Sequence, residues 1–270
     1  MGLESSLAKI DRAKKHIVEL DAAIDTFLKA DLNKVGTKRD PQSREPVYYL
    51  VSVADIPVEV AAITGDIIHN LRSALDHLAY QLVFMNTNGL GIPGKLNRDP
   101  FRNVYFPIGD CEERYITAKA SREVKAMGQK ALDAIDSIKP YKGGEDLLWQ
   151  LHKLDNTDKH RLVITVSSGL EGLDNAPILK GVYPETTKVP GLEFKWGTYP
   201  TGATFLCPLK AGDVLFTDLP DAEVQEEVTF SFDVALHEPG VIECKPLRET
   251  VKEMADLVSN IIYDFRSMIT

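Results

Sequence analysis

Residues 60–85 decide the fold, and they read VAAITGDIIHNLRSALDHLAYQLVFM. Pro57 stands just before them and suits the first turn of a helix, because its φ angle is already helical and its missing N–H needs no partner there. The next strong break in the pattern is Asn86-Thr87-Asn88-Gly89. The stretch contains neither Lys nor Glu, the residues that a solvent-exposed helix face normally displays. We therefore predict one long, central and largely buried helix.

This helix nevertheless carries one stripe of polar residues. At about 100° per residue, its polar positions fall on one side, centred on His69. A buried polar group without a partner costs free energy, so another polar element must face the stripe, and we expect it to be residues 152–161. The stripe comprises Gly65, Asp66, His69, Arg72, Ser73, Asp76, His77 and Tyr80, and the facing run contains His152, Asp155, Asn156, Asp158, Lys159, His160 and Arg161.

Apolar residues three or four apart predict further helices, and shorter apolar runs predict strands. Between residues 162 and 236, β-branched and aromatic runs alternate with turns, which favours a mainly antiparallel sheet of about five or six strands. We predict an α+β fold, with a helical bundle formed by residues 1–161 and 240–270 and a sheet inserted at 162–239. The other expected helices are 1–30, 121–138, 145–155 and 246–269; residues 31–46 are expected to be a loop; and the expected strands are 47–53, 162–166, 178–183, 192–199, 204–209, 214–217 and 228–236.

Composition narrows the class of protein. A 44% hydrophobic and 26% charged chain is ordinary for a folded soluble protein and excludes a disordered, collagen-like or disulfide-stapled one. The net charge of −9 argues against a surface that binds nucleic acid over its whole extent. No apolar run is long enough to span a membrane, so we expect no membrane partner. Cys111, Cys207 and Cys244 show no metal-binding spacing, and we expect them reduced, in the cytoplasm; His16 and His237 read as surface histidines.

The segment Arg72-Ser73-Ala74-Leu75-Asp76-His77 resembles the motif of the HEPN superfamily, in which an Arg is followed a few residues later by a His on a bundle helix. Proteins of that family are often metal-independent endoribonucleases that act as dimers. The resemblance implies that His77 removes the proton of a ribose 2′-hydroxyl and that Arg72 stabilises charge on the scissile phosphate. It implies His160 or Arg161 as the acid or as a second phosphate contact.

The same resemblance implies no cofactor, a homodimer and RNA as partner. The net charge limits RNA binding to a local basic patch, for which we expect Lys153, Lys159 and Arg161. Other polar residues of the stripe and of the facing run are then candidates for substrate binding. They are His69, Ser73, Asp76, Tyr80, Asp155, Asp158, Lys159 and Arg161.

Two other interpretations stay open. Arg72 and Asp76 are four residues apart, so the stripe could be an ion-paired network that specifies helix packing in a structural or binding protein. Alternatively, the chain could be a metal-dependent hydrolase. His69 and His77 lie about 12 Å apart along the helix axis and cannot share one ion. One of them would need further ligands from Asp155, Asp158 or His160.

Overall fold

The protein is described by a computed structural model that covers residues 2–30, 32–92, 94, 99–161, 166–174, 207–217 and 229–269. The side chains of residues 159–161, 170–174 and 229 are outside this description. The fold class is α+β, as the sequence predicts. The chain divides into two compact units. Unit 1 contains Met1–Asp21, Ala61–Ile164 and Arg248–Thr270, and unit 2 contains Ala22–Val60 and Thr165–Leu247.

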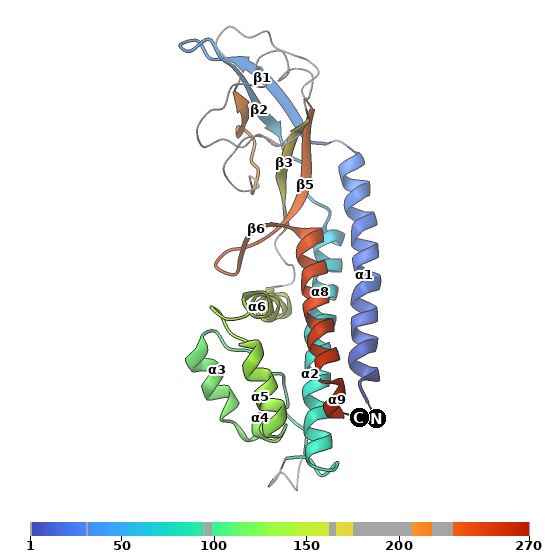
Figure 1. Ribbon diagram of the computed structural model, residues 1–270. Coiled ribbons are helices and arrows are strands. Elements are labelled where there is room, and N and C mark those ends of the chain that lie inside the picture. Colours follow the sequence, from blue (N-terminus) through green and yellow to red (C-terminus); the bar gives the residue numbers. More distant parts are fainter. Residues whose placement is uncertain are drawn as a thin grey trace, which may run out of the picture. The chain divides into compact units, whose positions relative to one another are not determined.

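Unit 1 is built mainly from helices, several of which run along one another (Figure 1). Lys9 Nζ donates to Asn70 Oδ1 at 3.4 Å, which ties the first helix to the second. Lys252 Nζ lies 3.0 Å from Asp21 Oδ2 and ties the first helix to the helix Leu247–Asp264. The helices are α1 (Glu4–Lys29), α2 (Val58–Asn86), α3 (Glu112–Lys119), α4 (Arg122–Lys125), α5 (Gln129–Ile138), α6 (Asp146–Arg161), α8 (Leu247–Asp264) and α9 (Arg266–Ile269), and the unit boundary falls within α1 and α2.

Unit 2 carries two antiparallel sheets of three strands each, with orders β1-β2-β4 and β3-β5-β6. Leu50, Leu209 and Leu215 form a small core, against which Val53, Phe230 and Phe232 pack. The sequence predicts a single sheet, so this arrangement corrects it. The strands are β1 (Lys34–Arg39), β2 (Pro46–Ser52), β3 (Val166–Asp174), β4 (Val214–Thr217), β5 (Thr229–Glu238) and β6 (Ile242–Pro246).

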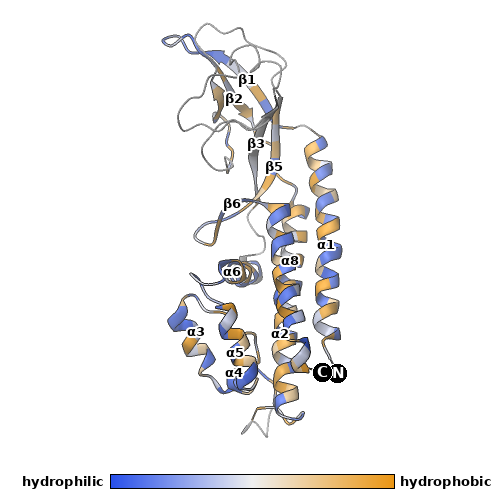
Figure 2. Ribbon diagram, viewed as in Figure 1, coloured by the Kyte–Doolittle hydropathy of each residue, from blue (hydrophilic) through white to orange (hydrophobic). Residues whose placement is uncertain are grey.

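Helix α2 is the long buried helix that residues 60–85 predict. Most of its residues are buried, and Figure 2 shows hydrophobic colouring along much of its length. Its polar stripe is only partly covered: Arg72 is buried, whereas Asp66 and His69 are exposed. The buried apolar side chains include Ile67, Ile68, Leu71, Leu75, Leu78 and Leu82.

Several predicted elements need correction. Residues 34–39, expected in a loop, form strand β1 and pair with β2. The single helix expected over 121–138 is broken at Gly128, whose φ of +88° suits glycine and not a helix. A Cβ at Gly128 would lie 2.5 Å from Asn86 Oδ1, so the chain must turn there without a side chain. The sequence does not predict helix α3 or strand β6. The strands expected at 178–183 and 192–199 lie outside the described residues, as do 162–165 and 204–206, and residues 207–209 are described but form no strand.

The cysteines are also arranged differently from the expectation. Cys207 and Cys244 form a disulfide across 37 residues, and Cys111 is free. The spacing of the cysteines does not indicate this pairing, because Cys244 lies in strand β6 and Cys207 in a separate segment that the fold brings beside it. Within the described residues, no helix is long and apolar enough to cross a membrane.

The burial of α2 predicts a large cost for truncating its apolar side. Leu71 is 0% exposed, so Leu71→Ala should lower the free energy of unfolding by about 2–5 kcal/mol through lost transfer energy and a residual cavity. Val18 on α1 is 70% exposed, and Val18→Ala should cost less than about 0.5 kcal/mol. Urea unfolding followed by circular dichroism measures both. A Leu71→Ala loss as small as that of the control would contradict the buried position of α2.

Candidate functional site

The polar side of α2 meets helix α6 along a set of contacts that we call the α2–α6 seam. The two helices come close at Gly65, where an added Cβ would lie 2.7 Å from Asp158 Oδ1. Glycine leaves room for the Asp158 carboxylate against α2. The expected pairing of the stripe with residues 152–161 is therefore present. The seam consists of Gly65, His69, Arg72, Ser73 and Asp76 from α2, and His152, Asp155, Asn156 and Asp158 from α6.

Arg72 is the hub of the seam. Its side chain is buried, and all three of its guanidinium nitrogens make hydrogen bonds within the protein. Nε donates to His152 Nδ1 at 3.3 Å, Nη1 to Asp76 Oδ1 at 2.6 Å, and Nη2 to the Phe106 carbonyl oxygen at 3.0 Å. A planar, permanently charged fork can hold several partners in fixed directions. Arg72 thus joins α2, α6 and the segment before α3.

Asp76 balances the charge of Arg72. Its Oδ1 also accepts the Phe106 N–H at 2.9 Å, so Arg72 and Asp76 together bond both sides of one peptide segment. Burial raises the pKa of Asp76, and the neighbouring Arg72 charge and the Phe106 N–H oppose this rise. Removing one member of such a pair leaves the other charge buried and unpaired, which is costly.

His152 is held neutral by its surroundings. Burial, followed by the charge of Arg72, lowers its pKa to about 4. Because Arg72 Nε can only donate, His152 Nδ1 must accept, and the ring hydrogen sits on Nε2. Nε2 lies 3.1 Å from Asn156 Nδ2, so a hydrogen on Nε2 requires the Asn156 amide to be turned by half a rotation, which brings its oxygen into the position of an acceptor.

His69 has the opposite environment. Its side chain is 48% exposed, while that of its partner Asp155 is 2% exposed. The Nδ1 atom lies 3.0 Å from Asp155 Oδ1, so the buried carboxylate fixes a hydrogen on Nδ1 and leaves the Nε2 lone pair outward. Ser73 Oγ lies 3.4 Å from Nε2 on the next helical turn. An oriented imidazole of this kind can remove a proton from a hydroxyl group.

A cavity of about 660 Å³ opens beside the seam. Polar atoms of both seam helices line one wall, and the segment 103–108 with the α3–α4 region lines the rest. His69 does not line it, so the exposed imidazole and the cavity are separate features joined by Asp155. The polar lining residues from the seam are Arg72, Asp76, His152, Asp155 and Asn156.

The remaining predicted site residues lie elsewhere or outside the description. His77 Nδ1 is buried and has no hydrogen-bond partner among the described residues. No hydrogen bond between Arg72 and His77 occurs there either, so the proposed catalytic pair is not assembled through a direct contact. Tyr80 packs in an aromatic cluster, 4.7 Å from Phe101 between ring centroids. The side chains of Lys159, His160 and Arg161 are not described.

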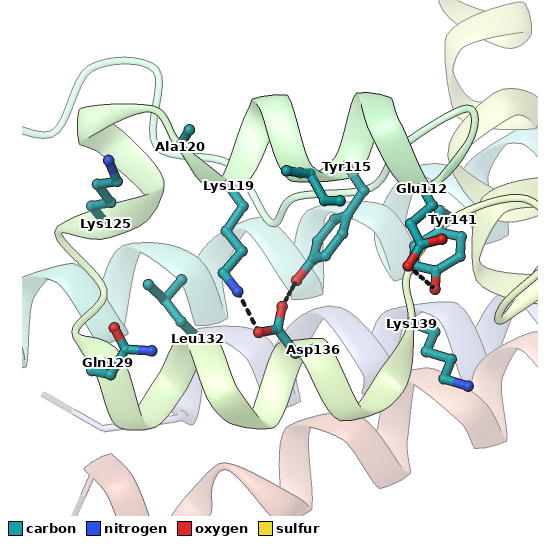
Figure 3. A pocket seen from close by; sticks show the side chains of 11 residues that line it. Glu112, Tyr115, Lys119, Ala120, Lys125, Gln129, Leu132, Asp136, Lys139 and Tyr141 are labelled. Carbon is teal, nitrogen blue, oxygen red and sulfur yellow. Dashed lines mark hydrogen bonds and ion pairs between the residues drawn. The ribbon is translucent and has the colours of Figure 1, made fainter.

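A second cavity, of about 820 Å³, lies between α3 and α5 (Figure 3). Some of its polar groups are bonded to one another: Asp136 pairs with Lys119 and accepts a hydrogen bond of 2.6 Å from the Tyr115 hydroxyl. Burial and the Asp136 carboxylate raise the pKa of Tyr115, so the phenol stays protonated as a donor. No histidine or cysteine among the described residues lines this cavity, so they offer no side chain suited to act as a general base near neutral pH.

Metal ligands are scarce at the seam. His69 and Asp155 supply two neighbouring ligand atoms, but the described residues contain no third His, Cys, Asp or Glu close enough to share an ion with them. A catalytic zinc ion normally has three protein ligands. The described part of the seam therefore gives the metal-dependent interpretation no support.

Comparisons with protein-family models, with curated proteins and with solved structures found no match. The chemistry of the site therefore rests on its own residues. Sequence reasoning placed His152 and Asn156 in the facing run but did not select them as site residues. Their spacing of four on a helix that faces the stripe was the available signal. The role of the Phe106 backbone had no signal in the sequence.

The lowered pKa of His152 predicts a pH-dependent stability. The unfolded histidine takes up a proton near its ordinary value of 6.5, whereas the folded one does so only near about 4. As the pH falls through this window, protons bind preferentially to the unfolded chain, and stability is lost by up to about 3 kcal/mol. His152→Asn, which keeps an acceptor for Arg72, should flatten this part of the profile in urea unfolding at several pH values. Equal pH dependence in both proteins would contradict the buried, neutral imidazole.

Proposed function

We propose that the chain is a metal-independent endoribonuclease whose general base is His69, oriented by Asp155. The observation that carries the proposal is the contrast between a half-exposed imidazole and the buried carboxylate that bonds its Nδ1 at 3.0 Å. A general base must reach a substrate, and its partner must hold one tautomer. His69 meets both requirements better than His77, whose Nδ1 is buried without a partner in the described residues.

In the proposed reaction, His69 Nε2 removes the proton of a ribose 2′-hydroxyl. The 2′-oxygen forms a bond to phosphorus, the bond to the 5′-oxygen breaks, and the products are a 2′,3′-cyclic phosphate and a 5′-hydroxyl. The leaving 5′-oxygen takes a proton, for which His160 remains the candidate acid. No metal is needed, because the nucleophile belongs to the substrate.

Ser73 indicates where the substrate hydroxyl would sit. Its Oγ lies 3.4 Å from His69 Nε2, at the long limit of a hydrogen bond, so it holds the lone pair only weakly. A ribose hydroxyl at a shorter distance could displace it. Ser73 itself lies within helix α2, where backbone N–H groups are used by the helix and cannot form an oxyanion hole. This favours a hydroxyl of the substrate over Ser73 as nucleophile.

Arg72 acts as a positioning residue in this proposal, not as the phosphate contact that the family resemblance implies. Its three nitrogens are occupied and its residue is 5% exposed. By fixing α6 against α2, it keeps Asp155 opposite His69. RNA as substrate and a homodimer come from the resemblance of Arg72–His77 to HEPN proteins.

The test is cleavage of an RNA pool in EDTA. His69→Gln and Asp155→Asn should each lower the rate by about 10²–10⁴-fold, because the first removes the base and the second lets the imidazole adopt the wrong tautomer. Asp66→Asn changes an exposed acid on the same helix and should leave the rate unchanged. An oligonucleotide without the 2′-hydroxyl should remain intact.

Two further variants separate the alternatives. Ser73→Ala should retain activity, and its loss would show that Ser73 is the nucleophile. If His77→Gln abolishes cleavage while His69→Gln does not, the base is His77 and the His69 proposal fails. Circular dichroism of each variant confirms that it is folded.

A non-catalytic structural role is the second candidate, and the saturated fork of Arg72 favours it. Buried networks of this kind can specify helix packing. In that case the wild-type protein cleaves no RNA under any condition. His69→Gln should then change the free energy of unfolding little, because the imidazole is half-exposed.

A further inference from the structure

Unit 2 contains three potential metal ligands that lie close together and take no part in the proposed nuclease reaction. The Sγ atoms of Cys207 and Cys244 and a ring nitrogen of His237 lie within 4.8 Å of one another. His237 Nδ1 is 3.5 Å from Cys244 Sγ. All three residues are half-buried, so solvent, a reductant or an ion can reach them.

A β-bulge delivers two of these ligands. Strands β5 and β6 lose register between the pairings of Leu236 and Glu238, so that His237 alone stands opposite Glu243 and Cys244. Bulges redirect side chains and are common beside functional sites. Cys244 also has a φ of +48°, a left-handed conformation that is uncommon for a residue other than glycine. The backbone is thus shaped to turn Cys244 toward His237.

The third ligand, Cys207, belongs to a segment that lies beside β3, the edge strand opposite β6 in the same sheet. Leu209 N donates to the Ser168 carbonyl oxygen at 3.1 Å, which places the segment after Cys207 beside β3. Ser167 Oγ lies 3.3 Å from Cys207 Sγ. A hydroxyl in this position can donate a hydrogen bond to a thiolate, as the outer contacts of metal ligands do.

The distance between His237 and Cys244 matches that of two zinc ligands, while the two sulfur atoms are bonded to each other and would have to separate on reduction. Zinc binds sulfur at about 2.3 Å and imidazole nitrogen at about 2.0–2.1 Å, so two such ligands in a tetrahedron lie about 3.6 Å apart. The observed 3.5 Å between His237 Nδ1 and Cys244 Sγ agrees with this value. A disulfide alone would not require a histidine nitrogen at that distance.

We propose that the reduced chain binds one Zn²⁺ through Cys207, Cys244 and His237, with water in the fourth position. A dithiol reductant supplies two electrons and two protons: the Cys207–Cys244 bond breaks, two thiols form, and the reductant becomes a cyclic disulfide. Zn²⁺ then displaces both thiol protons and binds the neutral imidazole. Zinc binds thiolates, and the two sulfurs are thiolates only when the S–S bond is broken. The disulfide and the zinc-bound state therefore exclude each other, and metal binding follows the redox state.

The experiment compares the same wild-type protein in two states. After reduction with a phosphine and removal of metals, it should bind one zinc per chain against a chromophoric chelator. The oxidised protein should bind none. His237→Ala should weaken zinc binding by about 100-fold or more, because a whole ligand is lost. Co²⁺ in place of zinc should give the absorption of tetrahedral thiolate coordination.

Cys111→Ser is the matched control, because it removes the free thiol of unit 1 and should leave zinc binding intact. Cys207→Ser and Cys244→Ser should each abolish tight binding, and circular dichroism reports their folding. Three results would overturn the proposal: a disulfide that resists reduction in the folded protein, reduced protein that binds zinc no better than oxidised protein, or zinc affinity unaffected by His237→Ala. Since wild-type protein alone gives the first two results, an unfolded variant cannot hide failure.

Discussion

A buried guanidinium lies at the centre of the α2–α6 seam. Arg72 cannot lose its charge, so its burial is tolerated only because Asp76, His152 and the Phe106 carbonyl oxygen satisfy it from three directions. These bonds fix where α6 and the segment before α3 lie against α2. The placement of Asp155 beside His69 follows from the same docking, so in the proposed mechanism Arg72 positions the site without contacting the substrate.

The two seam histidines, His69 and His152, differ in burial and in hydrogen-bond partners, and this difference gives them different chemical properties. Burial and the neighbouring charge of Arg72 lower the pKa of His152 to about 4, so its imidazole stays neutral near pH 7. His69, on α2, is half-exposed. The Asp155 carboxylate bonds its Nδ1, and only the weakly bonded Ser73 hydroxyl lies at its Nε2. The first serves packing, and the second is available for chemistry.

The sequence predicts α2 well because the absence of Lys and Glu reports burial directly. It also predicts that polar groups of a later helix must face the stripe, since buried polar groups need partners. It does not separate His69 from His77: the two differ by about 80° around the helix, and the position of α6 decides which one is oriented. The break at Gly128 depends on the close approach of Asn86, which no local pattern reveals. The cysteine pairing depends on a bulge between β5 and β6 and on a segment many residues away.

The central claim is that the seam holds its two histidines in opposite tautomers. Nitrogen-15 NMR of the imidazole rings at neutral pH measures this directly. The account predicts that His69 carries its hydrogen on Nδ1, toward Asp155, and that His152 carries its hydrogen on Nε2, with Nδ1 accepting from Arg72. Asp155→Asn should alter the tautomer of His69 and leave that of His152 unchanged, with its hydrogen on Nε2. Averaged signals for His69, like those of a free histidine in water, would contradict the oriented base and with it the proposed chemistry.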